Sequence, residues 1–80
     1  MCKIISLKVN HNNHFKDSFK LSLDNRKKIE FDFDKTHDTV NGILNELVTT
    51  IDENLNIEQL KKDMNILLKS KRIDCIYYEE

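Results

Sequence analysis

The chain has 80 residues, of which 39% are hydrophobic, enough for one small domain with a thin core and too few for a deep substrate cleft. Its 13 basic and 14 acidic residues give a formal net charge of -1, which argues against a surface dedicated to polyanions. With no proline, one glycine and two cysteines, a Gly-rich phosphate loop, a four-cysteine zinc site and a disulfide framework are not expected. We therefore expect a single cytoplasmic domain over residues 1–80, without a cofactor, a bound metal, a catalytic site or a membrane span.

Residues up to about 34 alternate between apolar and polar side chains, the pattern of half-buried strands. Residues 24–28 carry turn formers and charge and predict a hairpin connection, and residues 11–14 predict a polar link. His11 and His14 have a spacing that can suit a metal, but no further ligand lies nearby, so loop roles are expected. Three apolar trios predict three strands: Ile5, Leu7 and Val9; Phe19, Leu21 and Leu23; Ile29, Phe31 and Phe33.

From residue 38 the apolar spacing changes to that of an amphipathic helix. Asp38 precedes this helix and is expected to be its N-cap, and Asn56 is expected to cap a second helix with Gln59 as a capping-box partner. Residues 73–78 are expected to form a last strand. The expected apolar stripes comprise Val40, Ile43, Leu44, Leu47, Val48 and Ile51 in the first helix, and Ile57, Leu60, Met64, Leu67 and Leu68 in the second. The sequence predicts an α+β fold, a small antiparallel sheet of three or four strands with two helices packed on one face.

A small sheet covered by two helices leaves grooves between a strand edge and a helix, where an extended peptide can lie. At about 100° per residue, Glu46 borders the apolar stripe of the first helix. A carboxylate beside apolar side chains suits a cation that has a hydrophobic neighbour, so this helix is the place to look for a binding site.

The segment from the third strand into the first helix resembles a known family of docking domains. It is similar to the conserved C-terminal (CCT) domain of the oxidative-stress-responsive and SPAK kinases and to the related autoinhibitory domain of the with-no-lysine (WNK) kinases. The resemblance is strongest over residues 29–48 and extends more loosely over residues 19–72. The residues that carry it, in order, are Phe31, Phe33, Asp38, Thr39, Gly42, Ile43, Glu46 and Leu47.

The resemblance implies a non-catalytic module that binds short Arg-Phe-x-Val or Arg-Phe-x-Ile motifs, in its own polypeptide or in partner proteins, as part of a Ser/Thr kinase. Asp38 and Glu46 match the acidic pair that holds the arginine of the motif, and Phe31 and Leu47 match residues that line the phenylalanine pocket. A guanidinium presents a fork of N–H donors that two carboxylates can share. We expect the rest of the groove to be formed by Ile29, Ile43 and Thr50.

Each of these residues also has a simpler interpretation. Asp38 is first of all a candidate helix cap, Glu46 a solvated helix residue, and Phe31 and Leu47 ordinary core residues. Two other functions remain open: homodimerisation through the last strand or the groove, and nucleic-acid binding. The nucleic-acid hypothesis uses the sheet aromatics Phe31, Phe33, Tyr77 and Tyr78 with a basic cluster formed by Lys61, Lys62, Lys69, Lys71 and Arg72.

Overall fold

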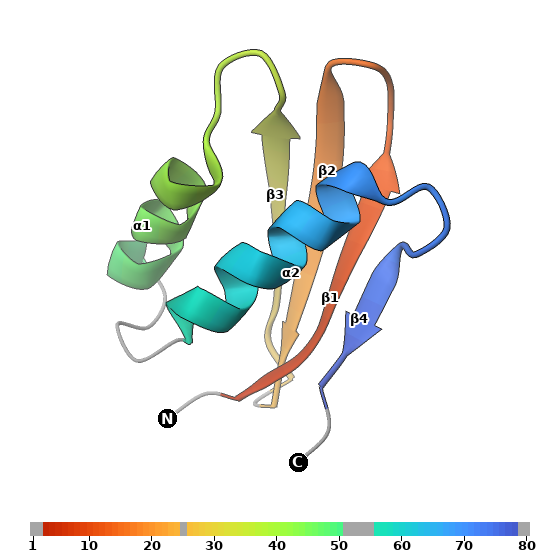
Figure 1. Cartoon of the computed structure of the whole chain (residues 1–80). Coiled ribbons are helices and arrows are strands. Elements are labelled where there is room, and N and C mark those ends of the chain that lie inside the picture. The colour runs from red at the N-terminus through yellow and green to blue at the C-terminus, as the bar shows by residue number, and fades with distance from the viewer. Residues whose placement is uncertain (1–2, 25, 51–55, 79–80) are drawn as a thin grey trace.

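The computed structural model describes residues 3–24, 26–50 and 56–78. In these residues the chain forms a four-stranded antiparallel sheet and two helices (Figure 1). The elements follow the order β1 (Ile4–His11), β2 (Lys16–Leu23), β3 (Lys28–Asp34), α1 (Val40–Thr50), α2 (Ile57–Lys69) and β4 (Cys75–Tyr77). The predicted α+β fold is confirmed.

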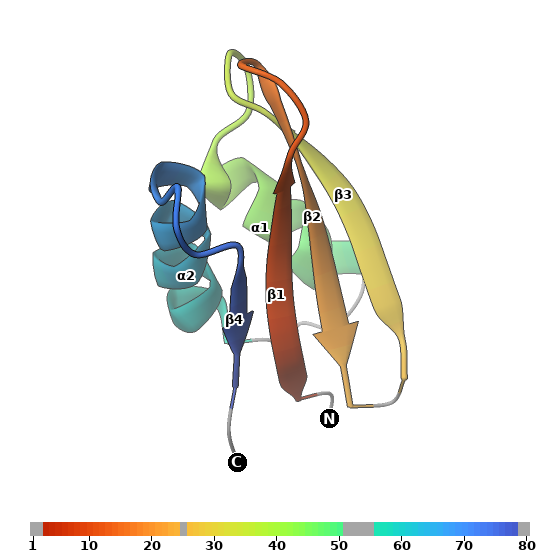
Figure 2. The same ribbon diagram turned by 90° about the vertical axis from the view of Figure 1, so that its right-hand side faces the viewer.

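The strand order in the sheet is β3-β2-β1-β4, so β3 and the three-residue β4 are the two edges. Both helices lie on the same side of the sheet, as Figure 2 shows, and the opposite face of the sheet is left bare. α2 packs over β1, and α1 packs against α2. This arrangement leaves α1 beside the edge formed by β3 (Figure 1).

The core lies between the sheet and the helices. Side chains that are opposite one another on adjacent strands meet there, because alternate residues of a strand point to the same face. Leu7 pairs with Leu21, and Phe19 lies between Val9 and Phe31. The ring of Phe31 stacks on that of Phe19 with their centroids 5.3 Å apart. The buried apolar residues are Leu7, Val9, Phe19, Leu21, Leu23, Phe33, Leu44, Leu47, Leu60, Met64 and Leu67.

The first strand departs from the expected alternation at its beginning. The pairing of β1 with β2 shifts register between Ile4 and Ser6, which inserts an extra residue into β1. As a result, Ile5 is 40% exposed, and Ile4 packs against the core in its place. The prediction that Ile5 faces the core is therefore wrong, whereas Leu7 and Val9 are buried as predicted.

The second helix begins as the sequence predicts. The Asn56 side chain accepts a hydrogen bond from the backbone N–H of Gln59 at 3.2 Å. The Gln59 side chain does not complete a capping box, because its amide donates instead to Asp63 Oδ2 at 2.9 Å. The same carboxylate oxygen accepts a hydrogen bond from the Tyr78 hydroxyl at 2.5 Å. Asp63, nearly buried, thereby joins α2 to the residue that follows β4.

A second buried carboxylate lies on the helix-covered side of β2. Asp17 is fully buried, and its partner on the adjacent strand β3 is Phe33. Its Oδ1 lies 3.0 Å from Nδ1 of His11 and 3.3 Å from Nζ of Lys35, both of which are partly exposed. These two ion pairs connect the end of β1 to the loop that follows β3. The expected loop role of His11 is also incorrect, because His11 is the last residue of β1.

Candidate functional site

The apolar residues proposed for the groove come from β3 and α1 and lie in the core or against it. Ile29 and Phe31 on β3 and Ile43 on α1 are half-buried and pack against the core, and Leu47 is 7% exposed. Leu47 therefore belongs to the floor of this region and not to an open wall. All four residues belong to the hydrophobic core or pack against it, and we call this set the β3–α1 margin.

Thr50 and Glu46 lie on the exposed part of α1. Glu46 has no hydrogen-bond or ion-pair partner for its side chain among the described residues. A rise of 1.5 Å per residue places it about 9 Å along the axis from Val40, the first residue of α1. Glu46 is exposed on α1, which agrees with its simpler interpretation as a solvated helix residue. Thr50 is exposed at the end of the described part of α1, and the predicted stripe residue Ile51 lies outside the described residues.

The helix cap differs from the prediction. Thr39 is the residue before α1, and its Oγ1 accepts a hydrogen bond from the backbone N–H of Gly42 at 3.1 Å. A Cβ on Gly42 would lie 3.0 Å from this same oxygen, closer than an ordinary van der Waals contact. Thr39, and not Asp38, therefore caps the helix, which begins at Val40.

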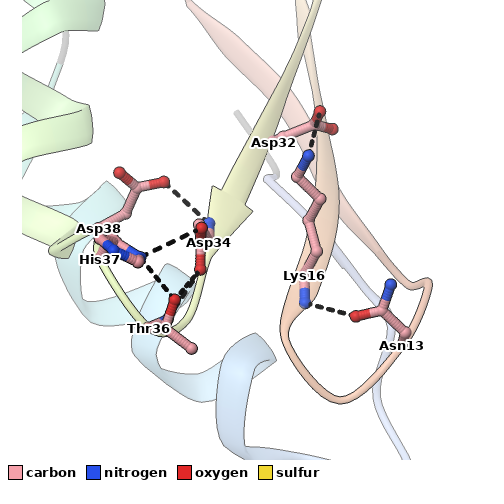
Figure 3. Close-up of polar contacts among 7 residues, drawn as sticks. All are labelled: Asn13, Lys16, Asp32, Asp34, Thr36, His37 and Asp38. Atoms are coloured by element: carbon pink, nitrogen blue, oxygen red, sulfur yellow. Dashed lines mark hydrogen bonds and ion pairs between the residues drawn. The ribbon is translucent and has the colours of Figure 1, made fainter.

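The Asp38 carboxylate instead closes the end of β3. Its Oδ2 accepts a hydrogen bond from the backbone N–H of Asp34 at 2.8 Å (Figure 3). In the opposite direction, the backbone N–H of Asp38 donates to the carbonyl of Asp34 at 2.7 Å. Oδ1 of Asp38 has no hydrogen-bond partner among the described residues. The bond to Oδ2 thus holds the carboxylate in place, and Oδ1 can accept a hydrogen bond from a ligand.

The loop between β3 and Asp38 is itself ordered by side-chain contacts. Asp34 Oδ1 accepts hydrogen bonds from the hydroxyl of Thr36 at 2.6 Å and from its backbone N–H at 2.9 Å. These bonds from Thr36, hydroxyl first, hold the pKa of Asp34 below its ordinary value. His37 Nδ1 lies 2.6 Å from the Thr36 hydroxyl and 3.5 Å from Asp34 Oδ2, as Figure 3 shows.

This loop network was not predicted, although the sequence carries a signal for it. An Asp followed two residues later by Thr is typical of a turn in which the carboxylate bonds backbone ahead of it. Its effect is to fix the path of residues 34–38, and with it the position of the Asp38 carboxylate.

The bare face of the sheet has a hollow of its own, and some of the charged side chains around it are paired. Lys20 Nζ lies 3.4 Å from Glu30 Oε1, and Lys16 Nζ lies 3.8 Å from Asp32 Oδ2. The Ser18 hydroxyl also donates to Asp32 Oδ1 at 3.0 Å. The polar side chains that line this hollow are Lys8, Asn10, Ser18, Lys20, Glu30, Asp32 and Asp74.

The aromatic residues of the nucleic-acid hypothesis do not share a face of the sheet. Phe31 and Phe33 belong to the helix-covered side, and the Tyr78 hydroxyl is bonded to Asp63. Tyr77 remains exposed, at 75%. A stacking surface for bases requires several exposed rings on one face, and these four residues do not provide it.

In residues 3–24, 26–50 and 56–78, no three His, Cys, Asp or Glu side chains gather in a way that could hold a metal ion. Neither of the described helices is long and apolar enough to cross a bilayer. No protein-family model matches the chain, and no curated protein or solved structure matches it either.

Proposed function

We propose that this chain is a non-catalytic docking domain that binds short Arg-Phe-x-Val or Arg-Phe-x-Ile motifs. The observation that carries the proposal is the position of Asp38, whose carboxylate is held at the end of edge strand β3, the strand that also carries Ile29 and Phe31 of the β3–α1 margin. An arginine bound there is followed in the motif by a phenylalanine, whose ring can be buried against the neighbouring apolar residues. The resemblance of residues 29–48 to the CCT domains supports the same conclusion.

The two acidic residues have unequal roles in this proposal. Asp38 is oriented by its bond to Asp34 and loses little freedom when it accepts a guanidinium, so its interaction with the motif is the stronger one. Glu46 is exposed and has no partner to orient it, so its contribution is that of a surface ion pair. The affinity for a short motif is about micromolar, because ordering the peptide offsets much of the contact energy.

In its biological setting, the domain acts within a cytoplasmic Ser/Thr kinase of the WNK or SPAK type. It recruits motif-bearing partners in trans, or binds a motif of its own polypeptide in cis and thereby regulates the kinase. The resemblance is the support for this setting, which is part of the proposal.

The experiment is a fluorescence titration of the chain with a labelled Arg-Phe-Ala-Val peptide flanked by neutral residues. Asp38→Asn keeps an oxygen for the Asp34 N–H but removes the charge, and should weaken binding by about 10- to 100-fold. Glu46→Gln should weaken it by about 2- to 5-fold. Glu58→Gln, which removes an equal charge from an exposed position on α2, is the matched control and should leave the affinity unchanged.

Peptide variants complete the test. Replacing either the arginine or the phenylalanine of the motif by alanine should abolish measurable binding. The proposal is wrong if the parent peptide does not bind, or if Asp38→Asn and the alanine peptides bind as tightly as the parent pair. A steep loss of affinity for single-stranded nucleic acid with added salt would favour the nucleic-acid function instead.

A further inference from the structure

The outer edge of β3 offers unpaired main-chain groups at defined positions. Two backbone bonds fix which residues of β3 point toward β2: Lys35 N–H donates to the Phe15 carbonyl at 2.8 Å, and Leu23 N–H donates to the Lys27 carbonyl at 2.9 Å. Since antiparallel pairs alternate, Phe33, Phe31 and Ile29 also exchange bonds with β2. The N–H and C=O groups of Asp34, Asp32 and Glu30 therefore point away from the sheet.

Only one of these outward positions is closed within the described residues. The outward N–H of Asp34 donates to Asp38, and its carbonyl accepts from the backbone N–H groups of His37 and Asp38. No described residue bonds the main-chain groups of Asp32 or Glu30. An edge with open residues next to a closed one is a template for an added strand that begins beside the closed position.

Building on the proposed docking function, we propose that the motif binds as a fifth strand, antiparallel to β3, with its arginine opposite Asp32 and its x residue opposite Glu30. The direction follows from Asp38: the arginine comes first in the motif and Asp38 lies at the carboxyl end of β3, so the peptide runs toward the start of β3. The register follows from the open groups, because the arginine and the x residue each exchange two main-chain bonds with their partners.

Side-chain alternation agrees with this register. Residues opposite one another in a sheet point to the same face, so the phenylalanine of the motif lies opposite Phe31 and its valine opposite Ile29, both toward α1. The arginine points to the bare face, toward the Asp32 side chain, which is 60% exposed and lies 3.8 Å from Lys16 Nζ in the free protein. Asp32 thus becomes a determinant of arginine recognition that the resemblance did not indicate.

A second copy of the chain fits this edge poorly. If two β3 strands pair antiparallel with their Phe31 residues opposite one another, Glu30 of each copy lies opposite Asp32 of the other. The two like-charged pairs are then on the same face of the sheet. Like charges directly opposite one another destabilise a sheet. A peptide that presents an arginine at this position has the complementary charge.

Two measurements test the inference. In the peptide, each amide N–H is replaced in turn by an ester oxygen, which removes one donor with little change of shape. Esters at the arginine and at x should weaken binding by about 3- to 10-fold each, whereas esters at the phenylalanine and the valine, whose N–H groups face solvent, should have no such effect. In the protein, the amides of Glu30 and Asp32 should exchange rapidly with solvent when free and slowly when bound, whereas those of Phe31 and Phe33 are slow in both states.

Variants give an independent check. Asp32→Asn should weaken binding of the parent peptide by about 3- to 10-fold and have little effect on a peptide with citrulline in place of arginine, with Glu58→Gln again as the control. Strand addition is wrong, and docking stands, if the parent peptide binds and Asp38→Asn weakens its binding but two further results are negative. These are that all four ester peptides bind with similar affinity and that the amides of Glu30 and Asp32 still exchange rapidly with solvent in the complex. If the parent peptide does not bind, both proposals fail. If hydrogen exchange of the Glu30 and Asp32 amides slows as the protein concentration rises in the absence of peptide, a second copy of the chain occupies the edge and the inference is wrong.

Discussion

The hydroxyl of Tyr78 donates a hydrogen bond to Oδ2 of Asp63 at 2.5 Å, and this contact joins the end of the chain's last strand to the middle of α2. Asp63 is only 4% exposed, so its carboxylate depends on protein partners for its hydrogen bonds. Tyr78→Phe should therefore lower the free energy of unfolding by about 1–3 kcal/mol. Urea denaturation measures this value, and Tyr77→Phe, at an exposed neighbouring ring, should change it by less than about 0.5 kcal/mol.

The same contact predicts a dependence of stability on alkaline pH. Burial, and then the hydrogen bond to Asp63, raise the pKa of Tyr78 above its ordinary value. The folded protein therefore holds the phenolic proton more tightly than the unfolded chain, so this contribution is complete below the ordinary pKa near 10 and is lost as the pH rises above it. Unfolding curves between pH 8 and 11 should show the stability gap between the parent and Tyr78→Phe narrowing. A gap that stays constant would contradict the assignment.

The loop after β3 predicts an acid-side titration. Thr36→Val removes the hydroxyl that bonds Asp34, so the pKa of Asp34 should rise toward its ordinary value. Because the folded pKa is depressed, the stabilising contribution of Asp34 is present above its ordinary pKa and is lost as the pH falls below it. NMR titration of the Asp34 carboxyl carbon measures the shift. Thr49→Val, which removes a hydroxyl bonded to carbonyls within α1, should leave the titration of Asp34 unchanged.

The close approach of Gly42 to Thr39 predicts coupling between the two positions. In a Thr39→Ala background, Gly42→Ala should stabilise the protein by up to about 1 kcal/mol, since alanine is the better helix former. In the parent, the new Cβ would lie 3.0 Å from the capping oxygen, so the gain should be smaller or reversed. Thermal unfolding of the four proteins in this cycle measures the coupling, and additive effects would show that the cap tolerates a methyl group.

Because the carboxylate of Asp17 is buried, removing its lysine partner alone should cost more stability than removing the lysine and neutralising Asp17 together. Lys35→Met removes the lysine partner of this carboxylate and should destabilise the protein by about 1–3 kcal/mol, less than for a fully buried pair because Lys35 is partly exposed. Adding Asp17→Asn to that variant should recover part of the loss, since the remaining buried group is then neutral. Lys28→Met is a control at an exposed lysine. If Lys35→Met has the same free energy of unfolding as Lys28→Met, the ion pair between Lys35 and Asp17 does not stabilise the fold.

Local pattern was sufficient to predict most of the fold. The trios Phe19, Leu21, Leu23 and Ile29, Phe31, Phe33 all face the helices, and the apolar stripe of α2 is buried at Leu60, Met64 and Leu67. Ile5 differs because alternation assumes an unbroken register, and nothing in a single strand reveals where its partner will accommodate an extra residue.

The candidate site was predictable in part. The apolar members Ile29, Phe31, Ile43 and Leu47 are buried in the core or pack against it, as their periods indicate, whereas the groove itself stays a prediction. The cap could not be assigned from composition, because adjacent Asp38 and Thr39 are both good caps and the choice depends on the Asp34 N–H, a backbone donor that Asp38 reaches across the loop. The buried acids Asp17 and Asp63 were also missed, since their partners come from distant parts of the sequence.

The shortness of β4 has a consequence for shortened forms of the protein. Its three residues cover part of β1, with further bonds from Val9 N–H to the Asp74 carbonyl and from Tyr78 N–H to the Ile5 carbonyl. A chain cut before Asp74 would leave the eight-residue β1 with a row of bare amides and carbonyls. Long unprotected edges of this kind recruit other chains into growing sheets, so such truncations should precipitate or form fibrils while the full chain stays dispersed.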